Sequence, residues 1–386
     1  MIKKFLPYSK HNIDTQDIKS VLKVLHSDHI TQGPNVINFE KKFAKYVGAK
    51  YAITCATGTA ALHLSCLALG INKKSSLATS SITFVASANC AEYLGAKVHL
   101  TDIDKKTYCM CPKSLEELLK KKKIDVVVPV HLCGHSADMK KIYNFKKKFK
   151  FKIIEDSCHA LGGTYCNYKI GSCKYSDIST FSFHPVKIVT TAEGGMALTN
   201  DRALAEKMAL FRSHGITKDP FLMTKAPDGP WYYEQIALGY NYRMTDLQAA
   251  LGISQMQRLQ GYIDRRHEIA DQYSRELSDL PLILPKQAEF AHSAYHLYVI
   301  RLDLDVIRPL THAEAFRALH DRDILVNLHY IPVHTQPYYQ KMGFQWGDFP
   351  NAETYYKSAI SIPMFPSLTC EAQTKVIAAL HEILEK

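Results

Sequence analysis

The sequence predicts an α/β protein with a mainly parallel central sheet, followed by a smaller α+β unit. Between about residues 50 and 200, short β-rich runs alternate with stretches of helical periodicity, the order of strands joined by helical crossovers. After Pro285 the pattern changes to a few strands and a closing helix. We therefore expect a large domain at residues 1–240, and connecting helices with a small C-terminal domain at residues 241–386.

The expected elements of the large domain follow from these runs. Strands are expected at residues 51–54, 97–102, 125–130, 152–156 and 179–183, with a further one at 196–199. Helices are expected at residues 59–69, 112–120 and 138–149. Ligands of such sheets bind beyond the carboxyl ends of the strands, so the chemistry is expected in the loops that follow them.

The second half of the chain begins with a loop. Residues 217–234 are rich in proline, glycine, aspartate and aromatic residues, which predicts a long surface loop. Helices are expected at 245–260 and 262–280, strands near 295–302 and 324–329, and a last helix after Cys370.

The composition favours a globular protein of the cytoplasm. The chain has 386 residues, of which 46% are hydrophobic and 22% charged. It contains no run of about 18 apolar residues that could span a bilayer, and its first seven residues lack the long apolar stretch of a signal peptide. The ten cysteines have no paired spacing, and Cys109 and Cys111 form C-x-C instead of a C-x-x-C pair, so we expect no metal site.

The formal charge of +11 raises the question of nucleic-acid binding. The lysines gather in short blocks, such as residues 120–123 and 146–148, each at the end of an expected helix, where cations complement the helix dipole. Solvated helix ends explain these blocks, so we expect no nucleic-acid partner. The basic surplus would attract an anionic small molecule.

A small-residue turn at residues 55–61, Cys-Ala-Thr-Gly-Thr-Ala-Ala, joins the first strand to a helix. Amides at a helix amino end bind phosphate, and Gly58 allows the backbone to approach closely. The alternative is a plain helix cap by Thr57 or Thr59.

Two carboxylates end the apolar strand Ile153-Ile154-Glu155-Asp156, and His159 follows three residues later. A buried carboxylate can pair with a pyridinium nitrogen and keep that ring protonated. Alternatively, Glu155 or Asp156 only caps the next turn.

A single lysine stands in the loop after the alternating strand residues 181–183, in Phe-Ser-Phe-His-Pro-Val-Lys187. Thr191-Ala192-Glu193-Gly194-Gly195 follows and leads into another strand. Most lysines are solvated surface charges, but partial desolvation near an anion site lowers the pKa of a lysine and frees its amine for Schiff-base chemistry.

A polar and aromatic turn, Gly239-Tyr-Asn241-Tyr-Arg243-Met-Thr245-Asp246, precedes an expected helix. Capping explains Thr245 and Asp246 without any function. It does not explain Asn241 and Arg243 between tyrosines.

Together these motifs resemble the DegT/DnrJ/EryC1/StrS family of pyridoxal-phosphate sugar aminotransferases, which have the aspartate-aminotransferase-like fold type I. The resemblance extends from Ile30-Thr31-Gln32-Gly33-Pro34 to residues 328–332, Leu-His-Tyr-Ile-Pro. The segment 181–187 with 191–195 is specific for the family.

The resemblance implies a role for each matching residue. Lys187 would bind the cofactor covalently and shuttle a proton, and Asp156 would hold the pyridine nitrogen. Phe84 would stack on the ring, with His159 also close to it. The phosphate would be held by Thr57, Gly58, Thr59 and Ser182 and, from a neighbouring subunit, by Asn241. A homodimer with shared active sites is thus expected.

Within the family, the chain is most similar to the branch that makes pseudaminic acid, which moves an amino group from glutamate to carbon 4 of a UDP-linked 4-keto-6-deoxy-N-acetyl sugar. His184 to Lys187 and residues 228–234 carry this similarity. It implies that His329 and Tyr330 lie near the sugar and that Arg243 meets an anionic group. His329 could instead only bond a backbone carbonyl. Thr57 stands where many members have serine, which keeps the hydroxyl.

Other functions fit the same fold. One is an aminotransferase acting at carbon 3 or on a dTDP-linked sugar, since sister enzymes share the core. Another is a dehydratase, in which histidine replaces the catalytic lysine, but Lys187 is present. A third is a non-catalytic sugar-sensing regulator, for which neither a missing lysine nor a DNA-binding segment is found.

Overall fold

The computed structural model of the chain describes residues 5–385. Its centre is a seven-stranded sheet in which β10 alone runs antiparallel to its neighbours. Across the sheet the strands are β2 (Tyr51–Cys55), β10 (Gly195–Thr199), β9 (Ile178–Ser182), β6 (Lys152–Asp156), β5 (Val126–Val128), β3 (Ser76–Ser80) and β4 (Lys97–Thr101). The predicted mainly parallel sheet is confirmed.

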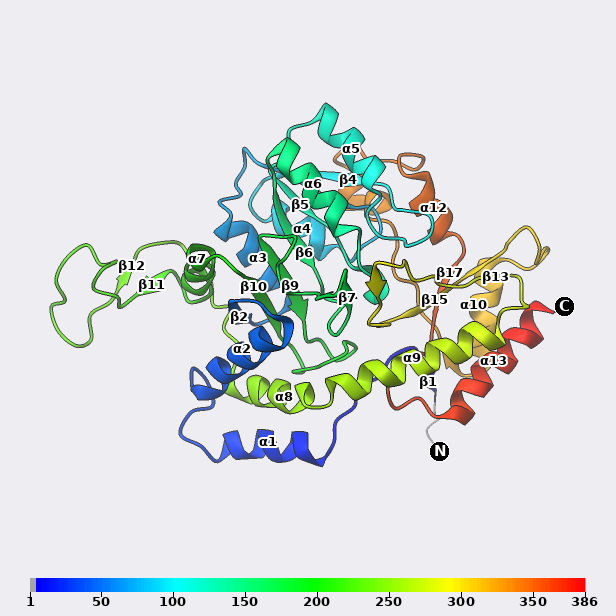
Figure 1. Cartoon of the computed structure of the whole chain (residues 1–386), viewed down its shortest axis with the longest axis horizontal. Helices are drawn as coiled ribbons and strands as arrows, with labels where there is room; N and C mark the ends of the chain where they lie inside the picture. Colours follow the sequence, from blue (N-terminus) through cyan, green and yellow to red (C-terminus); the bar gives the residue numbers. More distant parts are fainter. Residues whose placement is uncertain (1–4, 386) are drawn as a thin grey trace.

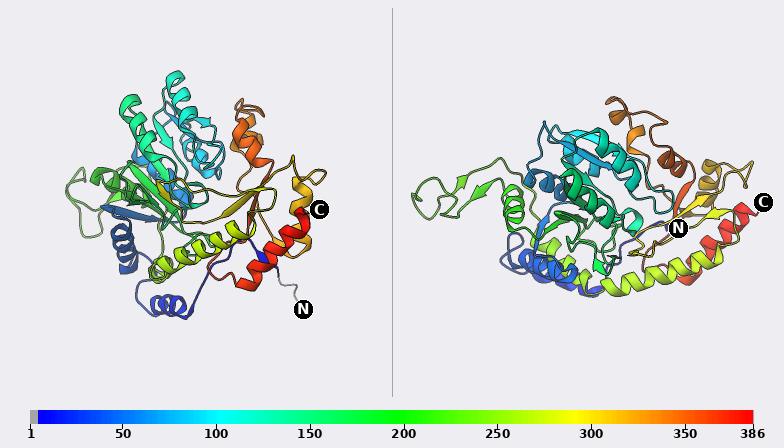
Figure 2. Two further views of the ribbon diagram at one scale, coloured as in Figure 1. Left: turned by 45° about the vertical axis from the view of Figure 1, so that its right-hand side comes forward. Right: turned by 45° about the horizontal axis from the view of Figure 1, so that its top comes forward.

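Helices cover both faces of this sheet, as Figures 1 and 2 show. Alternate strand residues point to opposite faces. Val126 and Val128 pack with α3 and α4, whereas Val127 between them packs with α5 and α6. The helices of this part are α1 (Thr15–Leu25), α2 (Pro34–Val47), α3 (Gly58–Ala68), α4 (Ala86–Glu92), α5 (Pro112–Lys121), α6 (Met139–Phe149) and α7 (Arg202–Arg212).

A smaller sheet and three helices enclose a second hydrophobic cluster toward the C-terminus. Its strands lie in the order β13 (Leu282–Ile283), β15 (Tyr298–Leu302) and β17 (Ala359–Ile362), and it packs against α9 (Leu259–Glu276), α10 (His312–Asp321) and α13 (Cys370–Leu384). The helix α9 follows α8 (Asp246–Met256) and runs from the large sheet to this cluster (Figure 1). The division at residue 240 stays a prediction.

Short elements complete the fold. They are the pair β1 (Leu6–Pro7) and β16 (Ile324–Leu325), the sheet of β14 (Ala291–His292), β7 (Thr164–Tyr165) and β8 (Tyr168–Lys169), and the helices α11 (Pro337–Gln340) and α12 (Pro350–Tyr356). The pair β1 and β16 joins the start of the described chain to the C-terminal unit.

The predicted loop at residues 217–234 is an arm that projects from the body (Figure 2). The strands β11 (Ile216–Thr217) and β12 (Glu234–Gln235) pair at its base. Large apolar side chains on it face solvent: Phe221 is 96% exposed, Trp231 73% and Leu222 54%. Its exposed apolar side chains set this arm apart from the buried core of the large domain.

Three sequence predictions differ from the structure. The strand expected at 324–329 ends at Leu325, because only residues 324 and 325 pair with β1. The strand expected at 125–130 is only the three residues of β5. The central strand β3 was not predicted, because Ser76-Leu-Ala-Thr-Ser80 is rich in hydroxyl residues although all five are buried. Thr79 satisfies its hydroxyl by donating to the carbonyl of Val128 at 2.8 Å.

Residues 1–4, part of the segment from which the lack of a signal peptide was inferred, lie outside the described residues. Over residues 5–385, none of the helices combines the length and the apolar character needed to cross a membrane.

Candidate active site

A cavity of about 550 Å³ lies at the carboxyl ends of the strands, where the sheet rule predicted it. Loops after β2, β3, β5, β6 and β9 contribute to its wall, and the segment around residue 329 closes it from the C-terminal unit. Ten of the predicted site residues line it: Thr57, Gly58, Thr59, Phe84, Asp156, His159, Ser182, Lys187, His329 and Tyr330.

The amino end of α3 forms one end of this cavity. Thr57 caps the helix, and its hydroxyl oxygen accepts the amide of Ala60 at 3.0 Å. The predicted capping by Thr57 is therefore confirmed, and it leaves other amides of the first turn free of this cap. The carbonyl of Thr57 accepts the amide of Ala61. The amides of Gly58 and Thr59, which have no acceptor within the helix, are left for a ligand.

Two glycines make this end of the cavity narrow. A Cβ on Gly58 would lie 2.7 Å from that of Ser182, and a Cβ on Gly195 would lie 2.2 Å from the carbonyl oxygen of Thr57. Only glycine allows the α3 turn, β10 and the end of β9 to approach so closely. The result is a tight cradle of amides and hydroxyls suited to a phosphate.

Asp156 ends β6 and is 6% exposed. Its carboxylate accepts the hydroxyl of Ser87 at 2.6 Å and the amide of Cys158 at 3.2 Å. Thr83 lies 2.8 Å from the same serine oxygen, and since Ser87 donates to Asp156, Thr83 donates to Ser87. One hydroxyl and one amide thus donate directly to this buried carboxylate, and Thr83 orients the hydroxyl of Ser87.

Glu155 has a separate role from its neighbour. Its carboxylate lies 3.1 Å from Nε2 of His131, and both side chains are buried. It therefore does not cap the next turn, and it is not part of the cavity lining.

Lys187 lies on a loop whose two ends meet at Phe183. The amide of Phe183 donates to the carbonyl of Gly194, and its carbonyl accepts the amide of Thr191 and the hydroxyl of Thr190. Burial lowers the pKa of Lys187, while the neighbouring Cys158 and Asp156 oppose that shift. A lysine with a lowered pKa has more free amine for covalent chemistry.

Three buried imidazoles, those of His159, His296 and His329, surround the cavity near Lys187. Burial, together with the Lys187 charge, lowers the pKa of His329 to about 3. Burial also holds the pKa values of His159 and His296 well below 6.5. All three are neutral at pH 7. His329 bonds Oγ of Ser361 at 2.8 Å, not a backbone carbonyl.

Tyr330 and His159 are joined across the cavity wall. The Tyr330 hydroxyl lies 3.0 Å from Nε2 of His159, and the ring of Phe84 is 5.9 Å from that of Tyr330. His159 and Tyr330 are separated by 171 positions in the chain, and Phe84 is still further from Tyr330. The fold alone brings them together.

Asn241 and Arg243 do not line the cavity of their own chain. They lie at the foot of the arm, where Asn241 is exposed and forms an isolated antiparallel β-bridge with Ser213. Capping does explain Thr245, which forms a capping box with Gln248 at the start of α8. Asp246 instead accepts the amides of Gly33 and Asn35 at the start of α2.

Sequence reasoning missed several residues of the wall, among them Tyr8, Thr83, His296 and Asn327. His296 is 2% exposed, and its Nδ1 has no hydrogen-bond partner in the part of the chain that is described. Its signal in the sequence, a histidine beside an apolar strand, is equally that of a core residue. Ser87 gave no signal at all.

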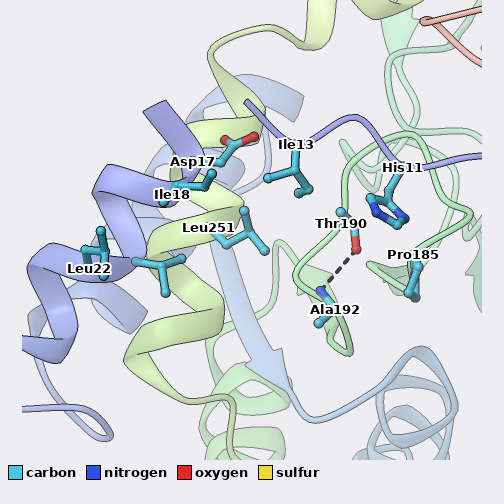
Figure 3. Close-up of a pocket in the computed structure, with 10 residues that line it drawn as sticks. His11, Ile13, Asp17, Ile18, Leu22, Pro185, Thr190, Ala192 and Leu251 are labelled. Atoms are coloured by element: carbon cyan, nitrogen blue, oxygen red, sulfur yellow. Dashed lines mark hydrogen bonds between the residues drawn. The ribbon is translucent and has the colours of Figure 1, made fainter. Parts of the chain in front are cut away.

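A second hollow of about 380 Å³ lies on the outer side of the Lys187 loop (Figure 3). Apolar side chains of α1, including Ile18 and Leu22, face Leu251 of α8 and Pro185 of the loop across it. Ile18 is 51% exposed and Leu22 45%. This hollow offers apolar surface but no reactive groups.

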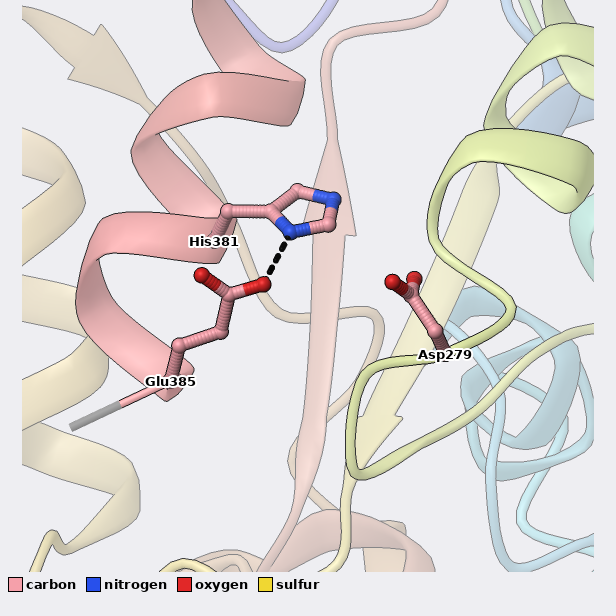
Figure 4. A group of neighbouring side chains, drawn as sticks. All are labelled: Asp279, His381 and Glu385. Atoms are coloured by element: carbon pink, nitrogen blue, oxygen red, sulfur yellow. Dashed lines mark hydrogen bonds and ion pairs between the residues drawn. The ribbon is translucent and has the colours of Figure 1, made fainter.

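One group of possible metal ligands comes together among residues 5–385, formed by Asp279, His381 and Glu385 (Figure 4). Nδ1 of His381 lies 2.6 Å from Glu385, and Nε2 lies 2.9 Å from the carbonyl of Glu276. Both ring nitrogens therefore serve as donors of a protonated imidazole. The group ties the end of α13 to the end of α9.

The similarity of this chain to known proteins identifies its family. The family model described as the DegT/DnrJ/EryC1/StrS aminotransferase family matches residues 11–381. The chain belongs to this family. The expected family, enzyme class and fold type are confirmed.

Two curated relatives cover almost the whole chain. The spore coat polysaccharide biosynthesis protein SpsC of Bacillus subtilis is 39% identical over 99% of this chain and 97% of its own. The UDP-4-amino-4,6-dideoxy-N-acetyl-beta-L-altrosamine transaminase of Campylobacter jejuni is 37% identical over 99% and 98%.

Solved structures of the family have the same fold. Helicobacter pylori PseC, an aminotransferase of pseudaminic acid biosynthesis, superposes with a TM-score of 0.90 at 31% identity, over 99% of this chain and 100% of that one. The pyridoxal-phosphate form of the sugar aminotransferase Spr1654 from Streptococcus pneumoniae superposes at 0.89 with 26% identity, over 99% of both chains.

This aminotransferase uses pyridoxal phosphate, and its cavity suits that cofactor. Its lining combines an amide cradle suited to a phosphate, a buried carboxylate that can pair with a pyridinium, and a lysine of lowered pKa. The residues present thus match the charge and the shape of the group.

Proposed function

We propose that this chain transfers an amino group from glutamate to carbon 4 of a UDP-linked 4-keto-6-deoxy-N-acetylhexosamine, the step of pseudaminic acid biosynthesis. The carrying observation is that Lys187, Asp156 and the α3 cradle line one cavity of a chain 37% identical to a transaminase named for the UDP-linked amino sugar. The match to PseC at a TM-score of 0.90 supports the same substrate class.

The cofactor would be held at three places. Gly58 and Thr59 would donate amides to its phosphate, with the hydroxyls of Thr57 and Ser182 beside them. Asp156 would hold the pyridine nitrogen, and its bonds from Ser87 and Cys158 fix the position of its carboxylate. When bound, pyridoxal phosphate supplies an electron sink next to the carbon that gains or loses nitrogen.

Lys187 would hold the cofactor covalently and act as the base and acid of the reaction. Its Nζ takes the proton from the carbon of the amino donor and returns a proton to the carbon of the sugar. Burial lowers the pKa of Nζ and so increases the fraction present as free amine. Phe84 and His159 would lie against the cofactor ring and exclude water, since both line the cavity with Lys187.

The sugar would lie between Lys187 and the segment with His329 and Tyr330. Lys187 is the only lysine or arginine among the residues that line this cavity within the described chain. A diphosphate needs positive partners, so Arg243 of a second subunit is the proposed partner of the anionic group. The basic surplus of +11 would favour the approach of such a substrate.

We therefore propose a cytoplasmic homodimer with shared active sites. Asn241 and Arg243 do not line their own cavity, and they lie at the foot of an arm with exposed aromatic side chains. The apolar hollow beside the Lys187 loop offers a surface that a second copy would cover. Asn241 would then reach the phosphate of the partner's cofactor.

The central test follows the absorption of the purified protein with pyridoxal phosphate. We expect a visible band from the cofactor on Lys187, which bleaches with glutamate and returns with the UDP-linked 4-keto sugar. If the band bleaches but this sugar does not restore it, the acceptor is wrong. Sugars with the ketone at carbon 3 or a dTDP group would then be tried.

Subunit mixing tests the shared sites. Lys187→Ala and Asn241→Ala chains are each expected to be nearly inactive, whereas a mixed dimer contains one cavity with both native residues. Mixing after mild dissociation should therefore give mixed dimers with up to about half the activity of a wild-type dimer. No recovery from a mixed dimer isolated with two different tags would contradict the proposal.

A further inference from the structure

The hydrogen bonds around His159 fix the direction of the bond to Tyr330. The backbone amide of Cys133 donates to Nδ1 of His159 at 3.3 Å. An amide can only donate, so Nδ1 carries a lone pair, and the neutral ring has its proton on Nε2. That Nε2–H is 3.0 Å from the Tyr330 oxygen and donates to it.

The hydroxyl proton of Tyr330 is consequently directed elsewhere. It cannot point at Nε2, which already carries a proton. No acceptor for it is found among the described residues, and Tyr330 lines the cavity with Lys187. Tyr330 is thus a donor whose acceptor is to be supplied by a ligand. Burial raises its pKa well above 10, so the proton stays on the oxygen.

The site distinguishes a ketone from an amine by this direction. A keto oxygen only accepts hydrogen bonds, whereas a protonated amine only donates them. The neutral hydroxyl, close to the neutral imidazoles of His159 and His296, suits a neutral carbonyl. The carboxylates of glutamate instead bind most strongly to a cationic donor, which the Tyr330 hydroxyl is not.

We propose that Tyr330, oriented by His159, donates a hydrogen bond to the keto oxygen of the acceptor sugar and so selects the keto sugar over the amino sugar. This inference rests on the proposed function and identifies the residue that recognises the reacting group. Tyr330 is a substrate-binding residue, and His159 is its positioning residue.

The half-reactions of Tyr330→Phe provide the first test. The rate constant of band recovery at low keto-sugar concentration should fall roughly tenfold, the effect of one lost neutral hydrogen bond. Bleaching by glutamate should stay within about twofold of wild type. Binding of the amino-sugar product, measured by calorimetry, should weaken by less than about twofold, since the amine offers no acceptor.

The matched control is Tyr338→Phe, which removes the same hydroxyl outside the cavity. Tyr338 is 57% exposed and bonds Glu92 at 3.2 Å. It should leave both half-reactions unchanged. Equal slowing of both half-reactions by Tyr330→Phe, or no slowing of recovery, would overturn the proposal.

The tautomer of His159 is a second readout that needs no substrate. In the ¹⁵N-histidine-labelled holoenzyme, the signal missing from a His159→Gln sample identifies this ring. We expect a protonated Nε2 and an unprotonated Nδ1. A proton on Nδ1 would reverse the bond and overturn the inference even if Tyr330→Phe failed to fold.

Failure of the proposed function has a different signature. If the wild-type band is not restored by the UDP-linked 4-keto sugar, the proposed acceptor is wrong, while the His159 tautomer still decides the direction of the bond. The Tyr330→Phe comparison is then made with whichever nucleotide keto sugar restores the wild-type band.

Discussion

The histidines of the cavity and the histidine at the end of α13 respond to their surroundings in opposite ways. In the cavity, burial and the Lys187 charge lower the pKa of His329 to about 3. At the C-terminus, the bonds of His381 to Glu385 and to the carbonyl of Glu276 raise its pKa above 6.5. The imidazoles of the cavity are neutral, whereas the imidazole at the end of α13 is more readily protonated.

The surroundings of a histidine, and not the residue type alone, therefore decide its protonation state. The cavity removes water from its histidines and gives them a lysine as neighbour, so protonation is disfavoured twice. His381 is partly open to solvent and has acceptors on both ring nitrogens. Substitutions in the two regions should therefore affect different properties, activity in the first and a small part of the stability in the second.

The largest effect is expected for Lys187→Ala. Transamination should fall by at least about a thousandfold, because covalent attachment and proton transfer are lost together. Cofactor should still bind through its phosphate, which equilibrium dialysis measures. His381→Ala, the matched change in the other region, should leave turnover unchanged. Retained turnover in Lys187→Ala would contradict the assignment.

Asp156→Asn should reduce turnover by roughly a hundredfold, the usual cost of one preorganised electrostatic group. The amide cannot balance a pyridinium charge, but it keeps the shape, so the urea midpoint should change little. Ser87→Ala, which removes the 2.6 Å bond to this carboxylate and the acceptor of Thr83, should have a smaller effect in the same direction. Equal turnover of wild type and Asp156→Asn would refute the role of the charge.

Acid should destabilise the cavity region. The pKa values of its histidines are lower in the folded than in the unfolded protein, so the unfolded state binds more protons below pH 6.5. Their stabilisation is full above about pH 6.5 and is lost as the pH falls. At pH 5, each histidine that stays neutral in the fold lowers the free energy of unfolding by up to about 2 kcal/mol relative to neutral pH.

Urea unfolding at pH 7 and pH 5 measures this loss. The difference between the two pH values should be smaller in His296→Leu than in wild type, because one proton uptake is removed while the carboxylates remain. An identical difference in both proteins would show that His296 does not stay neutral in the fold.

The smallest effect is expected at the C-terminal group. The raised pKa of His381 means that its stabilisation is full below about pH 6.5 and is lost as the pH rises through the folded pKa. His381→Ala should cost less than about 1 kcal/mol at pH 6, since the pair is partly exposed. The cost should be smaller at pH 9 by urea unfolding. A cost that grows with pH would contradict the ion pair.

Local patterns in the sequence were enough for much of the fold and for the reacting residues. The strand β6, bounded by the predicted residues, ends at Asp156, and the loop after β9 presents Lys187, because both follow from runs of a few residues with their turns. The amide cradle of α3 is equally local. Phe84, His329 and Tyr330, which line the same cavity, were expected only from the family resemblance.

Only the tertiary structure decided what depends on distant segments. Tyr330 and His159 meet across 171 positions, and Ser87 and Asp156 across 69. The strand β3 is set by burial between β4 and β5 despite its hydroxyls. Local periodicity contains no information on such contacts, because burial and hydrogen-bond direction arise only when separate strands and loops share one cavity.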